Sequence, residues 1–356
     1  MMRIGIFDPY LNDQGGGEKY MITLAQCLSK DNVVTVFWNN AQDLENVAKR
    51  FSLDISKIRL QNNIFSQDYP LLKRLLESAR YDRIIILSDG SIPFVFSRKL
   101  LVHFQQPFPQ IKISLKTQFK KMRVDHFFCN SFFTKFFIDK EFGINSQVIY
   151  PPVDPVVKKN KKQNVILHVG RFRARNIDSG DYKKQGVMIG VFKKMVERGL
   201  KGWKLILAVG LQDEDKPKFE KLKENAKDYP IEFLINLNKA DLHKAYSTSK
   251  IYWHASGYGE NLDENPELAE HFGISTVEAM GAGVVPVVIN AGGQKEIVEN
   301  GEDGYLWDSL EDLINKTNSL VENNKLWEKI SEKAIQKSRK FSGDRFCKEI
   351  KNIIEQ

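Results

Sequence analysis

The sequence has little of what marks secreted, metal-binding or membrane-spanning proteins. Its three cysteines, Cys27, Cys129 and Cys347, are odd in number and widely spaced, so no disulfide framework or zinc pattern can be read from them, which agrees with a reducing cytosol. No H-E-x-x-H motif accompanies the histidines, so we expect no bound metal. No apolar run approaches the roughly 20 residues that a membrane-spanning helix needs.

Length and composition are those of an ordinary soluble chain with two domains. The 356 residues exceed what one core usually accommodates, and 42% hydrophobic with 28% charged residues is a common balance. The net charge of +8 is compatible with anionic ligands or anionic lipid and demonstrates neither. The start, MMRIGIFDPY, reaches Asp8 too early for a signal peptide, so we expect a cytoplasmic protein.

Apolar runs typical of buried strands alternate with amphipathic segments along the whole chain. This alternation predicts an α/β fold with parallel sheets covered by helices. In the first half the predicted strands are Ile4–Phe7, Val33–Phe37, Arg83–Leu87, Leu100–His103, His126–Cys129 and Gln147–Tyr150. In the second half they are Val165–Val169, Lys204–Val209, Ile231–Leu234, Ile251–His254 and Val284–Ile289.

A break near residue 157 separates the two halves. The sequence YPPVDP, Tyr150–Pro155, ends regular structure, and the lysine-rich KKNKKQN after it is typical of a linker. We therefore predict one domain over residues 1–156 and a second over residues 157–335. Residues 336–356 belong to a final stretch, Leu326–Gln356, that we predict to form one or two helices.

Two glutamates stand seven intervening residues apart in EHFGISTVEAMGAG, Glu270–Gly283. Glu278 follows Ser275 by three positions, a capping-box spacing that predicts a helix from Thr276, with Glu270 on the loop before it. Free amides at a helix start bind anions, and carboxylates accept hydrogen bonds from hydroxyls. The segment therefore suits a ligand that joins phosphates to a sugar. An isolated pair of this kind would more often be a helix cap and a solvated charge.

A glycine-rich turn, NDQGGGEKY, joins the first predicted strand to a helix that we expect to start near Glu18. Gly15, Gly16 and Gly17 let the backbone approach a ligand closely, although tight strand–helix turns use glycine for steric reasons too. The turn lacks the G-x-G-x-x-G spacing, which disfavours nicotinamide or flavin binding.

Cations and histidines follow several predicted strands. Arg171 follows LHVG, and a lysine of KKQGVMIGVF precedes the next helix, so both would reach the carboxyl edge of the second sheet and suit a diphosphate. His103 ends LLVH in the first half, where it either reaches a ligand or is satisfied by backbone. His254 and His271 are two further histidines close in sequence to Glu270.

Two charged segments each have two interpretations. The acidic stretch Gly257–Glu270 is either a specificity loop or lid, or a solvated insertion. Lys112, Lys116 and Lys120 recur at helical spacing with large apolar residues between them. They either contact a membrane or an anionic lipid-linked acceptor, or form a solvated helix face.

The two glutamates together with their surroundings resemble the signature of retaining nucleotide-sugar glycosyltransferases of family 4. The matching residues are HFGIS before Glu278, VEAMGAG after it, and then VVPVVINAGGQKEIV. The family has the GT-B fold, in which two Rossmann-like domains present parallel sheets across a cleft and the last helix returns to the first domain. The resemblance implies the same fold here, with residues 336–356 packed on the N-terminal domain. It covers nearly the whole chain, most closely in the second half.

The resemblance also implies roles for individual residues. The family's paired cations would be Arg171 and Lys183, because Lys183 precedes the helix aromatic Phe192 by nine positions, and Lys184 is the alternative if the register is shifted by one. Both cations would hold the diphosphate, Glu270 would hold sugar hydroxyls, and His103 would approach the sugar's primary hydroxyl or the acceptor. The other contacts implied for the nucleotide sugar are Gly15, Gly16, Gly17, Phe272, Gly273, Ile274, Ser275 and Glu278, the last on the ribose diol.

The implied reaction moves a hexosyl group of mannose or glucose type from a GDP- or UDP-linked sugar to an acceptor hydroxyl, with retained configuration. Neither a metal nor another cofactor is expected, because cations and amides neutralise the diphosphate. The acceptor would be a saccharide or a lipid-linked one, and no nucleic acid partner is expected. The protein would be cytoplasmic, in part at the inner face of the membrane. A glycosyl phosphorylase or hydrolase and a non-catalytic sugar-binding module are the competing interpretations.

Overall fold

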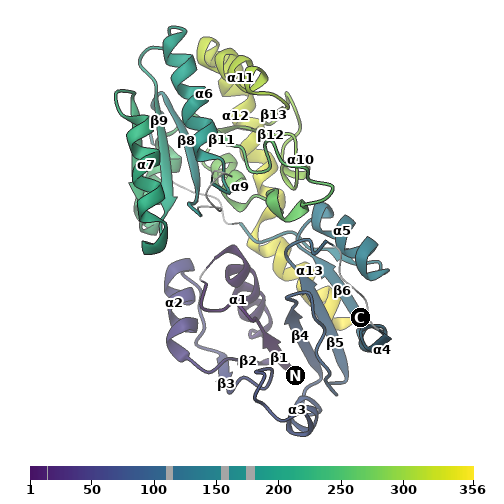
Figure 1. Cartoon of the computed structure of the whole chain (residues 1–356). Helices are drawn as coiled ribbons and strands as arrows, with labels where there is room; N and C mark the ends of the chain where they lie inside the picture. Colours follow the sequence, from purple (N-terminus) through teal and green to yellow (C-terminus); the bar gives the residue numbers. More distant parts are fainter. Residues whose placement is uncertain (14, 110–114, 154–159, 174–180) are drawn as a thin grey trace. The chain divides into compact units, whose positions relative to one another are not determined.

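The computed structural model describes residues 1–13, 15–109, 115–153, 160–173 and 181–356, with the side chains of 115 and 116 excepted. It divides into two units (Figure 1). Unit 1 comprises Met1–Pro152 and Gly343–Gln356, and unit 2 comprises Val153–Ser342. The predicted boundaries at 156 and 335 differ from these by four and seven residues. In the described ranges, no helix combines the length and the apolar composition needed to cross a bilayer.

Unit 1 is built on a seven-stranded sheet in the order β3-β2-β1-β4-β5-β6-β7, and its neighbouring strands pair in parallel. The strands are β1 (Arg3–Phe7), β2 (Val33–Phe37), β3 (Ile58–Gln61), β4 (Arg83–Leu87), β5 (Lys99–Phe104), β6 (His126–Cys129) and β7 (Gln147–Val148). On β4, Ile85 and Leu87 enter one hydrophobic core while Ile84 and Ile86 enter another. The sheet is therefore buried on both faces, which explains its nearly continuous apolar strands.

In unit 1, helices pack against both faces of the sheet and complete its two hydrophobic cores. They are α1 (Gly16–Leu28), α2 (Ala41–Phe51), α3 (Leu71–Ser78), α4 (Leu115–Lys121), α5 (Phe132–Phe142) and α13 (Gly343–Glu355). Met21 and Leu24 of α1 pack with Ile85, whereas Ile138 and Phe142 of α5 pack in the core on the opposite face.

The C-terminal helix α13 packs on α1 although the whole of unit 2 separates them in sequence. Phe346 and Ile350 are fully buried in the same core as α1. A disulfide joins Cys27 of α1 to Cys347 of α13, a pairing that could not be read from the number and spacing of the cysteines. The two cysteines lie 320 positions apart, and no spacing rule connects residues at that separation. Cys129 is free and buried.

Unit 2 contains a six-stranded parallel sheet in the order β10-β9-β8-β11-β12-β13. The strands are β8 (Val165–Arg171), β9 (Lys204–Gly210), β10 (Ile231–Ile235), β11 (Ile251–His254), β12 (Val285–Ile289) and β13 (Tyr305–Trp307). The helices are α6 (Gln185–Glu197), α7 (Lys216–Ala226), α8 (Lys239–Thr248), α9 (Ile274–Gly281), α10 (Gln294–Ile297), α11 (Leu310–Glu322) and α12 (Asn324–Ser338). Trp253 and Trp307 anchor its core and are fully buried.

Both sheets reverse their strand order at one point. In unit 1 the reversal lies between β1 and β4, and in unit 2 between β8 and β11. Open α/β sheets bind ligands outside the carboxyl ends of the strands at such a switch point. In unit 2 these ends carry Arg171 and His254. Together, the two α/β units with Rossmann-like parallel sheets form a GT-B fold.

Candidate active site

The candidate site of unit 2 is centred on the carboxylate of Glu270, which lies on the loop between β11 and α9. Its Oε2 atom accepts hydrogen bonds from Lys183 Nζ at 2.7 Å and from His254 Nε2 at 2.8 Å. Lys183 precedes α6 and His254 ends β11, so segments from both sides of the switch point converge on one carboxylate. Sequence reasoning placed all three residues nearby and did not predict that they bond to one another.

The environment fixes the charge of this cluster. Burial alone would raise the pKa of Glu270, but the Lys183 ammonium and the hydrogen bond from His254 hold that pKa well below its ordinary value. Burial lowers the pKa of His254, against the attraction of Glu270. His254 is therefore neutral near pH 7 and donates from Nε2 to an ionised carboxylate. Oε1 of Glu270 forms no hydrogen bond within the described residues, which leaves it for a ligand hydroxyl.

Tyr182 holds the two sides of the cluster together. Its hydroxyl donates to the backbone oxygens of Glu267, at 2.7 Å, and Ala269, at 3.0 Å. The same ring lies 5.1 Å from Lys183 Nζ, a cation–π contact. One side chain thus ties the segment before α6 to the loop that carries Glu270. An aromatic residue next to a lysine was the available signal for it in the sequence.

Two glycines after β12, Gly292 and Gly293, pack directly against the backbone of the Glu270 loop. The Gly293 N–H donates to the backbone oxygen of Glu270 at 2.7 Å. A Cβ atom at Gly293 would lie 2.5 Å from both the His271 oxygen and Phe272 Cα, and one at Gly292 would lie 2.4 Å from the Glu270 oxygen. No side chain fits at either position. A Gly-Gly pair directly after a predicted strand was the available sequence signal.

Helix α9 begins at Ile274, not at Thr276 as predicted, and its N-cap is Gly273. The capping-box interpretation was therefore wrong: the N-cap residue is a glycine without a capping side chain, and Ser275 accepts a hydrogen bond from the Tyr252 hydroxyl at 2.8 Å. Gly273 has φ +117°, a backbone conformation that side-chain-bearing residues rarely adopt. Helix α9 therefore starts from the left-handed turn at Gly273, where the sequence had predicted a serine cap.

Glu278 lies in the second turn of α9, one turn later than predicted. Its Oε2 accepts a hydrogen bond from the Tyr246 hydroxyl of α8 at 2.9 Å. Burial, together with the Glu278 charge, raises the pKa of Tyr246 well above its ordinary value, so this tyrosine remains a donor. Glu278 is half-buried and held in place, as a ligand-binding carboxylate needs to be.

The acidic stretch Gly257–Glu270 is partly anchored to the fold. Lys184 Nζ pairs with Glu260 at 2.6 Å, and both side chains are more than four-fifths buried. Pro266 and Leu268 are buried in a short 3₁₀ helix, while Asp263 and Glu264 are exposed. The anchored part does not fit a fully solvated insertion. Lys184 itself, the alternative diphosphate cation, is engaged by Glu260.

The segment before α6 is fixed by Asp181. Its carboxylate oxygens accept hydrogen bonds from the Gln185 amide at 2.7 Å and the Gly186 amide at 3.0 Å, which caps the helix. Lys184 takes a left-handed backbone conformation, φ 57°, at the N-cap position. Lys183 is thereby placed on the turn that faces Glu270. Arg171, at the end of β8, is exposed, and the loop residues 174–180 after it lie outside the described residues.

In unit 1 the glycine turn is shorter than predicted, because α1 begins at Gly16 rather than near Glu18. The Glu18 carboxylate accepts a hydrogen bond from the Gly15 N–H, and Gln105 Nε2 donates to the Gly17 oxygen at 3.2 Å. Gly15 is buried and Gly16 exposed, so the latter is the more accessible of the two.

His103 is fully buried between two aromatic rings. Its ring stacks on Tyr20 at 4.2 Å and on Phe128 at 4.4 Å between centroids, and Nδ1 lies 3.1 Å from the Phe128 oxygen. Burial lowers its pKa to about 3, so it is neutral near pH 7 and cannot serve there as a protonated acid. These contacts are those of a packed histidine satisfied by backbone. Nε2 alone lacks a partner among the described residues and is the atom a ligand could engage.

The other histidine near Glu270 and an Asp-x-Asp spacing of the chain each have a partner within the protein. His271 Nε2 lies 3.2 Å from the Glu267 oxygen. The chain's single Asp-x-Asp spacing, Asp213–Asp215, is a 3₁₀ turn in which Asp213 pairs with Lys216 at 2.7 Å. Within the described ranges, no group of three or more His, Cys, Asp or Glu could hold a metal ion.

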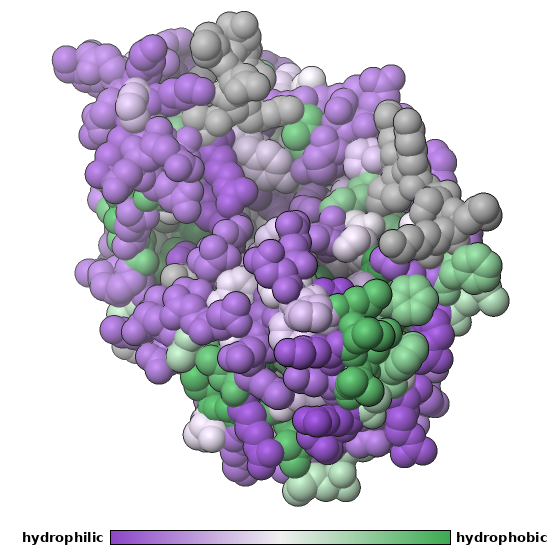
Figure 2. All heavy atoms as spheres, turned by 60° about the horizontal axis from the view of Figure 1, so that its bottom comes forward, coloured by the Kyte–Doolittle hydropathy of each residue, from purple (hydrophilic) through white to green (hydrophobic). Residues whose placement is uncertain are grey.

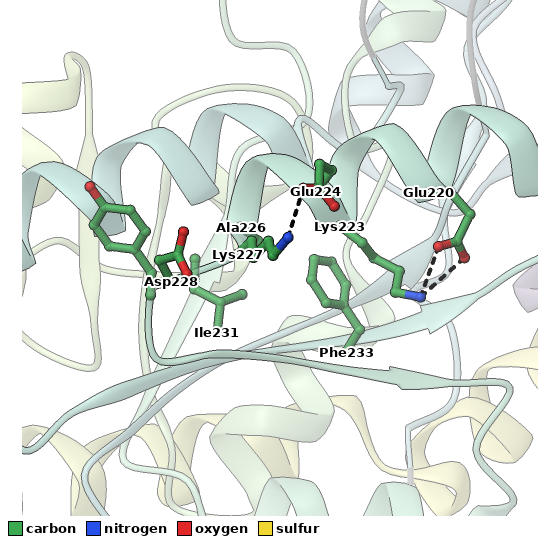
Figure 3. A pocket seen from close by; sticks show the side chains of 9 residues that line it. Glu220, Lys223, Glu224, Ala226, Lys227, Asp228, Ile231 and Phe233 are labelled. Atoms are coloured by element: carbon green, nitrogen blue, oxygen red, sulfur yellow. Dashed lines mark hydrogen bonds and ion pairs between the residues drawn. The ribbon is translucent and has the colours of Figure 1, made fainter.

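A surface hollow between α7 and β10 is remote from this cluster in the sheet order. It is lined by charged side chains that pair with each other, Glu220 with Lys223 at 3.0 Å and Glu224 with Lys227 at 3.3 Å (Figure 3). Phe233 and Ile231 of the edge strand form its base. Because four of its charged side chains pair with each other, we assign it no ligand.

Comparison with known proteins identifies the family of the chain. The sequence model of the family "Glycosyl transferases group 1" matches residues 152–337, just over half of the chain, which includes the Glu270 cluster and Glu278. The chain belongs to this family. A GDP-Man:Man(3)GlcNAc(2)-PP-Dol alpha-1,2-mannosyltransferase of Dictyostelium discoideum is 27% identical over 235 residues, 61% of this chain and 44% of that protein. The chain thus spans less than half the length of the first curated relatives it matches.

Other similar proteins match over their full length. An uncharacterized glycosyltransferase of Haemophilus influenzae is 23% identical over 99% of this chain and 100% of that protein. Among solved structures, a glycosyltransferase from Rickettsia africae superimposes with a TM-score of 0.76 at 17% identity, covering 99% of this chain and 98% of that one. Anabaena HepE in complex with UDP gives 0.74 at 17% identity, with both chains fully covered. At such identities these structures show the fold. The family membership rests on the sequence match over residues 152–337.

We predict that His254 positions the Glu270 carboxylate. Replacing His254 by alanine removes one of two donors to Oε2, and a misplaced carboxylate should lower kcat by about 10–100-fold with little change in donor KM. Because the His254 bond helps to lower the Glu270 pKa, the acid limb of the rate profile should move to higher pH. Steady-state kinetics between pH 5 and 9 measure both effects. His126→Ala, at a half-buried histidine of unit 1, is the matched control, and an unshifted acid limb would contradict the assignment.

Proposed function

We propose that the protein transfers a hexosyl group from a nucleoside-diphosphate sugar to an acceptor hydroxyl with retention of the anomeric configuration. The observation that carries this is the Glu270 cluster at the switch point of unit 2, where a carboxylate with a free oxygen lies beside a lysine and next to a helix start. A ligand with sugar hydroxyls on one side and phosphates on the other matches the carboxylate, the lysine and the helix start. Membership of the family supports a transferase rather than a binding module.

The proposed mechanism needs no nucleophile from the protein. The acceptor oxygen attacks the anomeric carbon on the face that the diphosphate vacates, the carbon–oxygen bond to the diphosphate breaks with both electrons going to the diphosphate, and the acceptor proton moves to that leaving group. The protein stabilises the growing charge. Lys183 has three N–H donors, of which one binds Glu270 and two can bind phosphate oxygens. Arg171 and the amides of Phe272–Ile274 would add further donors.

Glu270 would orient the sugar through its free Oε1, and Glu278 would accept hydrogen bonds from the ribose diol. The two carboxylates then bind opposite ends of the donor, with the diphosphate and the α9 amides between them. The hydrogen bond from Tyr246 keeps Glu278 fixed in advance, which lowers the cost of ordering it on binding. In unit 1, Gly15–Gly17 and His103 are proposed contacts for the donor and acceptor.

We propose a mannose- or glucose-type donor linked to GDP or UDP, and a saccharide or lipid-linked saccharide as acceptor. The mannosyltransferase relative is named for GDP-mannose and a dolichol-linked glycan, and HepE was solved with UDP, so the relatives support both bases. We further propose that no metal or other cofactor takes part, and that the protein works in the cytoplasm, in part at the inner membrane face through Lys112, Lys116 and Lys120. Lys112 lies outside the described residues. Activity that persists in a strong chelator would support the metal-free site.

The deciding experiment is a screen of nucleotide sugars. Incubation with GDP-, UDP- and ADP-linked mannose or glucose, and a saccharide acceptor, should release one nucleoside diphosphate and form a glycoside of unchanged anomeric configuration by NMR. A phosphorylase would instead require inorganic phosphate and yield a sugar phosphate. Absence of turnover together with absence of nucleotide binding would reject the proposal.

A second prediction concerns the ribose. Glu278→Ala should weaken nucleoside diphosphate binding by about 2 kcal/mol, because hydrogen bonds to a charged acceptor disappear. Tyr246→Phe removes only the hydrogen bond from Tyr246 to Glu278 and keeps the carboxylate, so its effect should be smaller. Titration calorimetry with the cognate nucleoside diphosphate measures both. Equal affinity of wild type and Glu278→Ala would reduce Glu278 to a structural partner of Tyr246.

A further inference from the structure

Helix α3 of unit 1 presents leucines to solvent. The exposed fractions of Leu71, Leu72 and Leu76 are 54%, 76% and 72%. Leu72 and Leu76 are one turn apart and lie on the same side of the helix, while Ser78 is fully buried on the other side. A helix normally buries its leucines, so α3 carries an apolar surface that the fold of unit 1 does not use.

Other exposed apolar side chains belong to segments that hydrogen bonds connect to α3. Phe96, 53% exposed, is joined to the end of α3 by a hydrogen bond from its N–H to Ser78 Oγ at 2.9 Å. Arg123 Nη2 donates to the Ser97 oxygen at 3.3 Å and so links the end of α4 to the same segment. Phe119 and Met122 of that region are 66% and 80% exposed.

We call Leu71, Leu72, Leu76, Phe96, Phe119 and Met122 the apolar face. Figure 2 turns the end of unit 1 that carries α3 toward the reader and shows hydrophobic surface there, bordered by hydrophilic surface. Contiguous apolar patches of this kind on a soluble protein mark interaction sites.

The charge around the apolar face identifies its partner. Segments 71–80, 96–99 and 115–125, which carry all six of its residues, contain nine basic and two acidic residues. Their formal net charge of +7 compares with +8 for the whole chain, so nearly all of the chain's excess positive charge belongs to these three segments. The Arg98 side chain is 80% exposed, and Lys73 and Arg80 are exposed on α3 and just after it. Apolar side chains within a basic border match the two layers of an anionic bilayer surface.

We infer that the apolar face docks the protein on an anionic lipid bilayer, with the leucines of α3 in the interfacial layer and the basic side chains on lipid phosphates. This inference rests on the proposed function, because a lipid-linked acceptor would be presented at a membrane surface. The proposed contact includes α3 and Phe96 in addition to the lysines that the sequence suggested, Lys112, Lys116 and Lys120.

The test measures vesicle binding without any sugar donor. Wild-type protein should co-sediment with vesicles of phosphatidylglycerol and phosphatidylcholine and not with phosphatidylcholine alone, and binding should fall as salt rises. The double variant Leu72→Glu and Leu76→Glu should lower the partition coefficient by about tenfold or more, because two apolar side chains leave the interface. Lys73→Glu with Arg80→Glu should lower it similarly at low salt.

Matched controls keep the result interpretable. Lys201→Glu with Lys221→Glu makes the same charge change at exposed positions of unit 2 and should bind vesicles as wild type does. Nucleoside diphosphate binding should be unchanged in every variant, so loss of docking and failure of the proposed transferase are measured separately. If the wild-type protein does not co-sediment with anionic vesicles, the inference is overturned. So would a concentration-dependent dimer that Leu72→Glu with Leu76→Glu dissociates, since a second copy would then be the partner.

Discussion

The variant Glu270→Ala is expected to lose sugar transfer by about 10²–10³-fold, the effect of deleting one well-placed charged group at a reacting centre. Two consequences combine in this substitution. The sugar loses the carboxylate oxygen that has no other partner among the described residues, and Lys183 loses the group that fixes its ammonium beside the leaving diphosphate. Lys183 and His254 are 18% and 1% exposed, so removal of their shared acceptor should also cost about 3 kcal/mol of folding stability.

Two measurements separate the chemical effect from the structural one. Initial rates with saturating donor report transfer, and urea unfolding reports stability. Glu270→Gln keeps the shape and an acceptor oxygen but no charge, so it should recover most of the stability and little of the rate. Glu322→Gln, at an exposed position of α11, controls for the loss of one negative charge. If Glu270→Gln retains wild-type turnover, the charge of this residue takes no part in transfer.

The same carboxylate gives a signed pH dependence. Because the pKa of Glu270 is lower in the folded protein than its ordinary value of 4.5, the unfolded chain binds the proton more tightly. Its contribution to stability is therefore fully present above pH 4.5 and is lost as pH falls through the lowered folded-state pKa. The stability difference between wild type and Glu270→Gln should shrink over that range. A difference that stays constant would mean that the ion pair does not form.

The alternation of apolar runs and amphipathic segments predicted the parallel α/β units, because strands buried on both faces leave an unambiguous sequence pattern. It missed β3, Ile58–Gln61, and β13, Tyr305–Trp307. Both are short strands at the edge of a sheet, where one side has no neighbouring strand and the burial pattern is weak. The pairing of Cys27 with Cys347 was equally hidden, since it depends on α13 packing against α1.

Sequence reasoning placed the site residues better than it placed their contacts. Glu270, Lys183 and His254 were all candidates, because motif spacing and strand ends reveal position along the sheet. Which of them share hydrogen bonds depends on backbone turns that sequence does not specify, such as the left-handed Lys184 and the sharp turn at Gly273. The prediction that Ser275 caps α9 was wrong for this reason. The serine hydroxyl accepts a hydrogen bond from Tyr252 of β11 and does not cap its own helix.

The variant Gly293→Ala is expected to reduce transfer by more than about 100-fold although residue 293 would touch no substrate. Its added methyl group would meet three backbone atoms of His271 and Phe272 at 2.5–2.7 Å, and backbone cannot rotate away as a side chain can. The loop must therefore move, and Glu270, whose backbone oxygen accepts from the Gly293 N–H, moves with it. Turnover and nucleoside diphosphate affinity should both fall, because the same loop leads into the α9 amides.

The matched control for that variant is Gly190→Ala in the middle of helix α6, where a methyl group would meet nothing within 4 Å. Alanine is the better helix residue, so this change should raise stability by about 0.5–1 kcal/mol and leave turnover as in wild type. The two variants make the same chemical change and differ only in what surrounds it. Equal turnover in both would mean that the Glu270 loop tolerates displacement, and that its fixed position is not what makes the site work.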